Sequence, residues 1–280
     1  MPVWLVLSAA LVAVAAAGTL VRLAPGVDPL TLAFGRVLLA GLLLLPFGVR
    51  GFVAPRRRDA NLMMLAGVFL ALHFWAWFTS LQQTSVMRST VLVCTTPVWV
   101  GLLEAMVLKR PPPPRYWPGI ALALIGIFGL SSGKGPGTGS LNGDALALLG
   151  SWLGASYFVI GGVVRPRVAL GVYGPAVYLS SAAALLGLAL VTGAPLLPVG
   201  PTALGAMGVV VGMALGPQLV GHLGFNWAVK YVPARIVAAV ILLEPVGASA
   251  VAAVVLREVP TRGDGGWALL LLAGVGLACS

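Results

Sequence analysis

The chain has 280 residues, of which 59% are hydrophobic and only 9% are charged, whereas a soluble globular domain carries about 25% charged residues. This composition excludes an ordinary soluble domain and indicates a protein of the lipid bilayer. The formal net charge is +10, but the basic residues stand at the ends of apolar runs and not on amphipathic faces, so we predict no nucleic-acid partner.

Ten apolar runs appear when the sequence is divided at charges, prolines and glycine clusters. A helix needs about 20 apolar residues to cross a bilayer, so we predict an all-α integral membrane protein with ten transmembrane helices. The first run has no basic residue before its apolar core, so we expect a retained span and not a cleaved signal peptide. In chain order the runs are residues 3–21, 29–49, 60–80, 86–108, 116–132, 143–163, 172–192, 202–228, 234–256 and 266–279.

The sequence contains an internal repeat. The stretch from Leu81 to Pro112 returns from Val229 to Pro260, and placing Pro97 on Pro245 gives a shift of 245 − 97 = 148 residues. A repeat of this kind means that one structural unit is present twice. We predict two five-helix units, residues 1–132 and 143–280, joined by a Gly-rich connector at residues 133–142.

Five spans per unit is an odd number, so the second unit must enter the membrane from the side opposite to the first. The repeat is therefore predicted to be inverted, an arrangement in which a site at the bilayer midplane lies between the two halves. Eleven Lys and Arg residues fall in the connections on one side and five on the other. By the positive-inside rule, we predict a multi-pass protein of the cell inner (plasma) membrane with both termini cytoplasmic.

Four segments resemble the EamA-type transporters of the drug/metabolite transporter superfamily. They are LTLAFGRVLLAGLLLLP (Leu30 to Pro46), TSVMRSTVLVCTTP (Thr84 to Pro97), GDALALLGSWLGASYFVI (Gly143 to Ile160) and LLEPVGASAVAAVVLRE (Leu242 to Glu258). The resemblance covers nearly the whole chain. It implies export or facilitated movement of amino acids, nucleotide-related metabolites or small organic cations, through a central cavity lined mainly by spans 1, 3, 4, 6, 8 and 9.

Glu244 is the sharpest candidate for a substrate-binding residue. It lies nine residues beyond Arg235 and thirteen before Arg257, which at about 1.5 Å per residue places it near the middle of the bilayer. A charge at that depth costs on the order of 3 kcal/mol, so such a residue usually faces a cavity or a partner. Either it binds a substrate ammonium group or a proton, or it ties its helix to a neighbour such as Arg36.

Arg36 lies inside the second run, seven residues after Pro29. Facing inward, it can pair with Glu244 or with a substrate carboxylate, whereas near the outer interface it extends its charge to water. We favour a structural role, because the resemblance makes the second span peripheral. Glu104, five residues before Lys109, is expected at the membrane interface.

The third run offers His73 and Trp77, which share a helix face because they are four residues apart, while Trp75 points nearly the opposite way. Histidine titrates near neutral pH and can respond to a proton gradient, although a hydrogen-bonded structural histidine is the commoner case. We predict that His73 and Trp77 line the cavity.

The fourth run places Thr95, Thr96 and Trp99 around Pro97. Proline removes a backbone hydrogen bond and frees a carbonyl, which makes a polar spot and a hinge in one place. Pro245 does the same in the ninth run. Matching interruptions in two halves point to a binding site, so we predict Thr95 and Trp99 as substrate-binding residues, with Pro97 and Pro245 as hinges. Simple kinks that serve packing remain the alternative.

Further candidates come from the sixth and eighth runs. They are Trp152, Ser156 and Tyr157 in the sixth run, and His222 and Asn226 in the eighth. Gln218, His222 and Asn226 follow a four-residue step, so they form one polar stripe that must face protein or water and not lipid. Packing contacts between helices would use the same residue types.

The function that these features favour is a transporter, expected to export small amphiphilic metabolites such as amino acids or organic amines by alternating access. The alternative is a structural or assembly subunit of the membrane without a transport path. An enzyme is not expected, because the acidic residues do not pair as catalytic groups would. No metal or cofactor is expected either, since Cys94 and Cys279 have no metal-binding spacing. The expected partners are a small-molecule substrate and the lipid bilayer, with the protein as a monomer.

Overall fold

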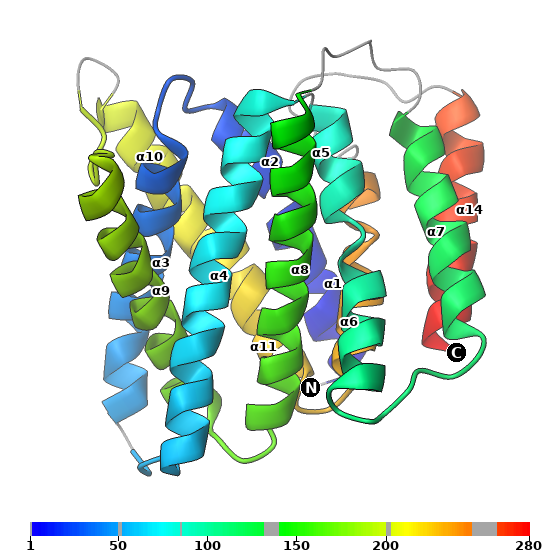
Figure 1. Ribbon diagram of the computed structural model, residues 1–280, viewed down its shortest axis with the longest axis horizontal. Coiled ribbons are helices and arrows are strands. Elements are labelled where there is room, and N and C mark those ends of the chain that lie inside the picture. Colours follow the sequence, from blue (N-terminus) through cyan, green and yellow to red (C-terminus); the bar gives the residue numbers. More distant parts are fainter. Residues whose placement is uncertain (1, 50–51, 85, 132–139, 200–202, 248–261) are drawn as a thin grey trace.

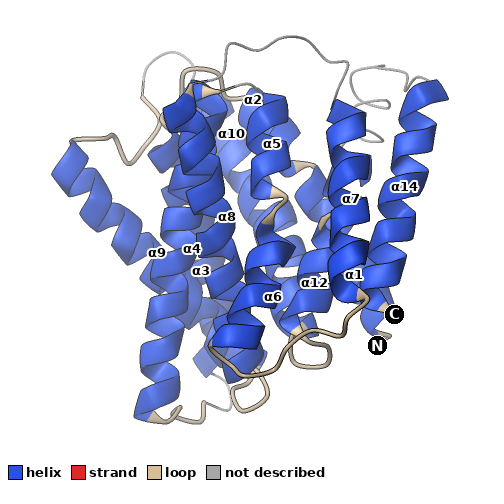
Figure 2. Cartoon of the chain, turned by 45° about the vertical axis from the view of Figure 1, so that its right-hand side comes forward, coloured by secondary structure: helices blue, strands red, loops and turns tan. Residues whose placement is uncertain are grey.

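The structure, a computed structural model, describes residues 2–49, 52–84, 86–131, 140–199, 203–247 and 262–280. Every regular element in these ranges is a helix (Figures 1 and 2). Seven of these helical segments are long and apolar enough to cross a membrane, namely Val3–Val21, Pro29–Val49, Arg57–Gln83, Arg88–Met106, Leu141–Val164, Leu170–Thr192 and Ala203–Ala228. The predicted class of α-helical membrane protein is thus confirmed. Residues 133–139 of the connector and 248–256 of the ninth run lie outside the described ranges.

The helices follow one another along the chain with short connections. They are α1 (Val3–Ala15), α2 (Ala17–Arg22), α3 (Pro29–Val49), α4 (Arg57–Gln83), α5 (Val86–Val93), α6 (Thr96–Met106), α7 (Tyr116–Ser131), α8 (Leu141–Val164), α9 (Leu170–Thr192), α10 (Ala203–Met213), η1 (Ala214–His222), α11 (Leu223–Ala228), α12 (Ala234–Ile241) and α14 (Arg262–Cys279). Helical structure also resumes at Glu244 and continues to Gly247.

Several predicted runs are interrupted, so the expectation of one continuous helix per run was wrong for them. α5 ends at Val93, α10 ends at Met213 and α12 ends at Ile241. Each of these residues lies four positions before a proline, Pro97, Pro217 or Pro245. A proline ring clashes with the carbonyl four residues earlier and has no N–H to bond it, which explains why the α-helix stops there.

The consequences of the three prolines differ. After Val93 the chain makes a turn at Cys94 and Thr95 before α6 begins, and after Ile241 it turns at Leu242 and Leu243. After Met213 the chain instead widens into the π-helix η1, which contains Pro217. π-helical turns are rare and occur frequently at functional sites.

Helices from the first part of the chain pack antiparallel against helices from the second part. The N–H of Ser140, just before α8, donates to the carbonyl of Gln83 at the end of α4. At the other end of this pair, Arg167 follows α8 and contacts Asp59 at the start of α4. α4 and α8 therefore lie side by side in opposite directions, as Figure 1 shows.

Glycines mark three further antiparallel contacts where backbones approach closely. A Cβ atom added to Gly48 near the end of α3 would lie 2.6 Å from the carbonyl oxygen of Gly171 near the start of α9. One added to Gly221 of η1 would lie 2.5 Å from the Val14 side chain of α1, and one added to Gly224 would lie 3.0 Å from Ala10. α7 and α14 meet in the same way, because Gly126 faces the backbone of Leu271. Small residues at such contacts are typical of helices packed within a membrane.

The outside of the bundle is apolar. Leu190, Val191 and Leu204 are 75%, 85% and 87% exposed, as expected for side chains that face lipid. Polar and charged side chains such as Arg36, Gln218 and Asn226 are instead buried inside the bundle. The marked N- and C-terminal ends lie at the same end of the bundle (Figures 1 and 2).

Candidate functional site in a central cavity

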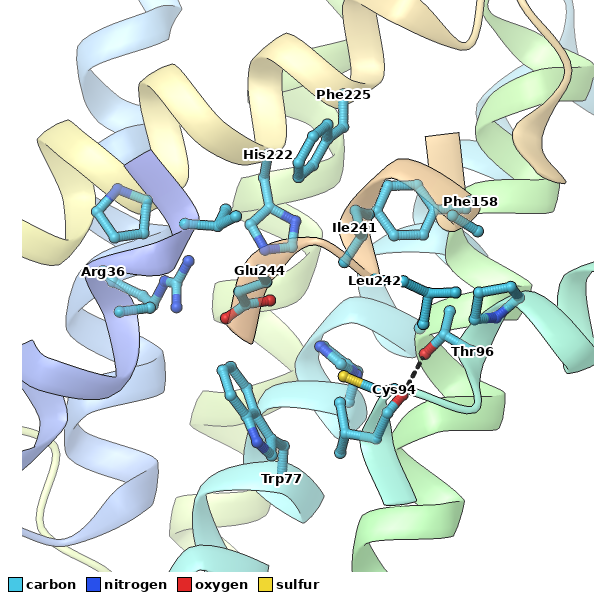
Figure 3. Close-up of a pocket in the computed structure, with 18 residues that line it drawn as sticks. Arg36, Trp77, Cys94, Thr96, Phe158, His222, Phe225, Ile241, Leu242 and Glu244 are labelled. Carbon is cyan, nitrogen blue, oxygen red and sulfur yellow. Dashed lines mark hydrogen bonds between the residues drawn. The ribbon is translucent and has the colours of Figure 1, made fainter. Parts of the chain in front are cut away.

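A cavity lies in the middle of the bundle, where early and late helices meet (Figure 3). The space that the centres of water molecules can occupy is about 60 Å³, which is room for roughly four to six waters at ~10–15 Å³ each. A small solute of comparable bulk fits this space. The lining residues are Val14, Ala17, Arg36, His73, Trp77, Val93, Cys94, Thr96, Pro97, Gly154, Phe158, Pro217, His222, Phe225, Ala238, Ile241, Leu242 and Glu244.

The two proline-related turns form part of this lining. Val93, Cys94 and Thr96 line the cavity on one side, and Ile241, Leu242 and Glu244 line it on the other. Each residue of the first set lies 148 positions before its counterpart in the second, since 241 − 93, 242 − 94 and 244 − 96 all equal 148. Trp77 and Phe225 make a fourth pair, because 225 − 77 is also 148. The internal repeat of the sequence therefore converges on this cavity.

The polar groups at the first turn are satisfied by hydrogen bonds within the protein. The Thr96 hydroxyl donates to the Val93 carbonyl at 2.8 Å, and the hydroxyl groups of Thr95 and Ser151 lie 2.9 Å apart. Ser151 is a fully buried residue of α8. Tyr116 of α7 donates its hydroxyl to the Pro97 carbonyl at 2.7 Å. These contacts hold the turn against α8 and α7.

The second turn carries a charge that is not paired in this way. Within the described residues, the Glu244 carboxylate makes no hydrogen bond or ion pair, although it faces the cavity. Arg36 faces the same space from α3 (Figure 3). No ion pair of 4.0 Å or less joins Arg36 to Glu244. The predicted structural tie between these two residues is therefore not formed as a direct contact.

Arg36 is held by two contacts other than an acidic partner. Its Nε donates to the side-chain oxygen of Gln218 at 2.9 Å, and its guanidinium carbon lies 4.1 Å from the centre of the Phe74 ring. The side chain is 1% exposed. Both terminal nitrogens, Nη1 and Nη2, lack a hydrogen-bond partner in the described structure. An open guanidinium fork thus faces the cavity in a fixed orientation.

The two histidines of the chain approach the cavity from opposite helices. His73 Nδ1 lies 2.7 Å from the Gly150 carbonyl, and because a carbonyl only accepts, this nitrogen must carry the proton. The His73 ring also stacks on Trp77, with centres 6.0 Å apart. His222 packs edge-on against Phe74 at 5.2 Å. The predicted positions of His73, Trp77, His222 and Glu244 therefore converge on one space.

Six other predicted site residues do not line this cavity. Tyr157 and Asn226 are fully buried beside it, where the tyrosine hydroxyl donates to the asparagine side chain at 2.8 Å. Ser156 donates to the Trp152 carbonyl within its own helix at 3.0 Å. Trp152 is 38% exposed and packs against Phe69. Thr95 contacts Ser151, and Trp99 packs against the hydrophobic core.

Other lining residues were not singled out from the sequence. Cys94, Phe158, Pro217 and Phe225 all line the cavity, and Arg36 was assigned a structural role on a peripheral span. The repeat carried a signal for Phe225, because it is the counterpart of Trp77. No equivalent signal existed for Phe158, which is one of many apolar residues in α8. Within the described residues, no group of three or more His, Cys, Asp and Glu could hold a metal ion.

Ion pairs connect the two parts of the chain at both ends of the bundle. Arg167 contacts Asp59 at 2.6 Å, and Arg235 contacts Glu104 at 2.8 Å. A third pair, Arg88 with Asp144, joins the start of α5 to the start of α8 at the opposite end. Glu104, expected at the interface, is instead buried, with 5% exposure. Its sequence position near Lys109 concealed a partner that lies 131 residues away.

Comparison with known proteins assigns the chain to a recognisable group. The profile of the EamA-like transporter family matches residues 1–132 and 141–279. The uncharacterized transporter YdfC of Bacillus subtilis (strain 168) is 28% identical over 137 residues, which are 48% of this chain and 44% of YdfC. The uncharacterized transporter YwfM of the same organism is 31% identical over 118 residues, 41% of this chain and 40% of YwfM. The chain thus spans less than half the length of these curated relatives.

A solved crystal structure has the same fold. It superposes with a TM-score of 0.81 over 98% of this chain and 95% of its own, at 17% sequence identity. Agreement at this level of identity concerns the architecture, and it extends to nearly the whole chain.

Proposed function

The chain belongs to the EamA-like transporter family, as its sequence resemblance predicted, and from that premise we propose that it carries small amphiphilic metabolites across the membrane through the central cavity. Amino acids and organic amines are the solutes in view. The observation that carries this proposal is the cavity itself, which is built on two matching helix interruptions. The family and the names of the relatives point to a transporter rather than an enzyme.

The contacts between helices support two inverted units. Exchanging each helix with its counterpart 148 residues away turns the contact of α4 with α8 into the contact of α11 and η1 with α1. The same exchange returns the antiparallel pairs α3 with α9 and α7 with α14 to themselves. A two-fold axis in the membrane plane has this effect, and such an axis underlies alternating access in inverted-repeat transporters. Ten spans in two five-helix units, residues 1–132 and 143–280, fit this pattern.

The chemistry of the cavity favours a small solute that is mostly apolar. Trp77, Phe158 and Phe225 supply aromatic walls, while Arg36 and Glu244 supply one charge of each sign. Recognition of several phosphate groups needs a cluster of inward Arg or Lys, and Arg36 is the one basic Arg or Lys side chain that lines the described cavity. Polyphosphates are therefore disfavoured.

Alternating access requires that each end of the bundle can close. Asp59 with Arg167 and Glu104 with Arg235 link the two units at one end, and Arg88 with Asp144 links them at the other. Opening the cavity toward one side would separate the pairs on that side while those opposite stay formed. Pro97 and Pro245, beside the two turns, are the proposed hinges.

Export and the inner membrane are also part of the proposal. Both termini lie at one end of the bundle (Figure 1), and the excess of Lys and Arg in the predicted connections favours the cytoplasm as their side. Export follows the family resemblance.

The test is solute movement in vesicles that contain the purified protein. We expect saturable counterflow of at least one member of a panel of amino acids and organic amines. Trp77→Ala, in the cavity wall, should reduce it, and Trp152→Ala, a partly exposed tryptophan outside the cavity lining, is the matched control. Absence of movement for the whole panel, together with water-inaccessible cavity positions, would favour a structural or assembly subunit instead.

A further inference from the structure

We propose that Arg36 is the carboxylate-binding residue of the central cavity, and that Arg36 and Glu244 together select zwitterions, of the amino acid class, over simple amines. This inference rests on the proposed transport function and specifies its substrate. It follows from the contacts of Arg36, the absence of a direct pair with Glu244, and the walls that lie around both.

The guanidinium of Arg36 is positioned but not neutralised. Gln218, which is uncharged, accepts a hydrogen bond from Nε at 2.9 Å, and the Phe74 ring supports one face of the group at 4.1 Å. Nη1 and Nη2 are left without a partner although the residue is 1% exposed. These two nitrogens form the fork that binds both oxygens of a carboxylate in parallel.

An unneutralised cation inside a membrane protein is costly, on the order of 3 kcal/mol or more. A purely structural arginine would be expected to offset this cost by contact with the nearest acid. Glu244 faces the same cavity, yet no ion pair within 4.0 Å forms between the two. The cavity therefore keeps one charge of each sign apart, with space between them for a solute.

A zwitterion complements this arrangement better than an amine does. Its carboxylate would bind the Arg36 fork, and its ammonium group would bind the Glu244 carboxylate across the cavity. A simple amine would satisfy Glu244 but leave Arg36 unpaired, and it would bring a second positive charge near the first. The side chain of the zwitterion would then lie against Trp77, Phe158 and Phe225, which line the same space.

The size of the cavity limits the solute. Roughly four to six waters fill the space, and at ~30 Å³ each they occupy about 120 to 180 Å³. A single small amino acid fits this bulk, whereas a peptide does not. The occupant is thus a small apolar amino acid or a compound with the same pair of charged groups.

The experiment compares matched solutes in vesicles that contain the full-length protein. The panel consists of L-leucine, leucinamide and isoamylamine, and of L-phenylalanine, phenylalaninamide and 2-phenylethylamine. Within each set the apolar group is constant and the carboxylate is present, replaced by an amide, or absent. Competition for counterflow gives the relative affinity of each solute. We expect the zwitterion of at least one set to bind at least tenfold more tightly than its amide and its amine.

Two variants connect this preference to Arg36. Arg36→Gln should abolish it, with a loss of about tenfold to a hundredfold for the zwitterion and little change for the amine. Arg36→Lys keeps the charge but loses the fork, so the preference should fall without disappearing. This second variant serves if Arg36→Gln does not fold. Glu244→Gln should weaken zwitterion and amine alike.

The outcomes separate the inference from the function on which it rests. If the wild-type protein moves amines as well as or better than the matched zwitterions, the inference is wrong and the transport function stands. The same conclusion holds if both Arg36 variants keep the wild-type preference. If no member of the panel is moved or bound, the proposed transport of amino acids and amines fails as well.

Discussion

The two interrupted spans have the same backbone arrangement and different chemistry. In each, an α-helix ends four residues before a proline, a short turn follows, and a new helix begins at the cavity. At the first turn, Thr96 donates to Val93 and the turn is bound to Ser151 of α8. At the second, the corresponding residue is Glu244, whose carboxylate has no partner in the described structure.

This difference shows how a duplicated unit acquires an asymmetric site. The repeat supplies the geometry of the cavity through its prolines, which act on the backbone whatever side chains surround them. The charge that can recognise a solute comes from one unit only at this position. We therefore expect that changes at the first turn mainly affect how firmly the site is held, and that changes at the second mainly affect what it binds.

The largest expected effect is at Glu244. Glu244→Gln keeps the shape of the side chain and removes its charge. Since a hydrogen bond to a charged group contributes about 1.5–3 kcal/mol, we expect solute affinity in vesicle counterflow to fall by about tenfold to a hundredfold.

Its counterpart provides the control, because Thr96→Val removes the hydroxyl from the equivalent position of the first turn. That variant should change affinity by no more than a few-fold. Equal losses from both variants would contradict the division of roles between the two turns.

The next effect tests whether the repeat is also symmetric away from the cavity. Gly126 and Gly274 are counterparts, and a Cβ on either would lie within 2.6 Å of backbone atoms in the opposite helix of the α7 and α14 pair. Gly126→Ala and Gly274→Ala should each destabilise the protein by about 1–3 kcal/mol, because overpacked contacts force the helices apart. Thermal unfolding in detergent measures this loss.

Gly276→Ala is the matched control on α14, since a Cβ at that position meets nothing within 4 Å. It should leave the unfolding temperature nearly unchanged. A similar loss of stability in all three variants would indicate that helix composition, and not the contact between α7 and α14, is responsible.

A smaller effect is expected at Ser151, which binds the first turn to α8. Ser151→Ala removes hydrogen bonds to Thr95 and Thr96, and a neutral hydrogen bond contributes about 0.5–1.5 kcal/mol. We expect lower stability by about this amount, with solute preference unchanged.

Ser180→Ala is the comparison, because the Ser180 hydroxyl bonds only the Ala176 carbonyl of its own helix among the contacts described. Thermal unfolding and counterflow of both variants test the assignment. A change in the order of preferred solutes in Ser151→Ala would show that the first turn also takes part in recognition.

The smallest effects are expected at the ion pairs between the units. The pair of Glu104 with Arg235 is more buried than that of Asp59 with Arg167, since the arginine side chains are 22% and 46% exposed. Exposed ion pairs contribute about 0–1 kcal/mol. A double-mutant cycle on unfolding should therefore give a larger coupling for Glu104 with Arg235, and the reverse order would contradict this reading of burial.

The sequence predicted the general architecture because hydrophobic length and charge position act locally and additively. It placed Glu244, His73, Trp77 and His222 at positions that the structure brings to one cavity. It did not predict where helices break. Pro97, Pro217 and Pro245 each follow a helix end by four residues, yet Pro46 and Pro175 lie inside α3 and α9. Whether a helix tolerates proline depends on neighbours that rebond the freed backbone groups.

Residues whose role depends on distant partners were also missed. Arg36 was assigned to a peripheral span, but its orientation is set by Gln218, which lies 182 residues later. Trp152 and Ser156 share the sixth run with Phe158, and the local pattern gave no reason to prefer Phe158. Side-chain direction on an apolar helix is decided by packing, which the order of residues along one helix does not specify.

The most direct test of the account is whether water and solute reach both turns. Cys94 is a natural cysteine at the first turn, and Cys279→Ser makes it the one cysteine of the chain. Leu242→Cys, in a protein that also carries Cys94→Ser and Cys279→Ser, places a thiol at the equivalent position of the second turn. Val68→Cys, on the outer face of α4 with 37% exposure, is the control in the same background.

Both cavity thiols should react with a small water-soluble methanethiosulfonate reagent in membrane vesicles, while the Val68→Cys thiol should not. A transported solute should slow both reactions. If the thiols at positions 94 and 242 are as unreactive as the one at position 68, the two turns do not enclose a solute-accessible space, and the account of this protein as a carrier is contradicted.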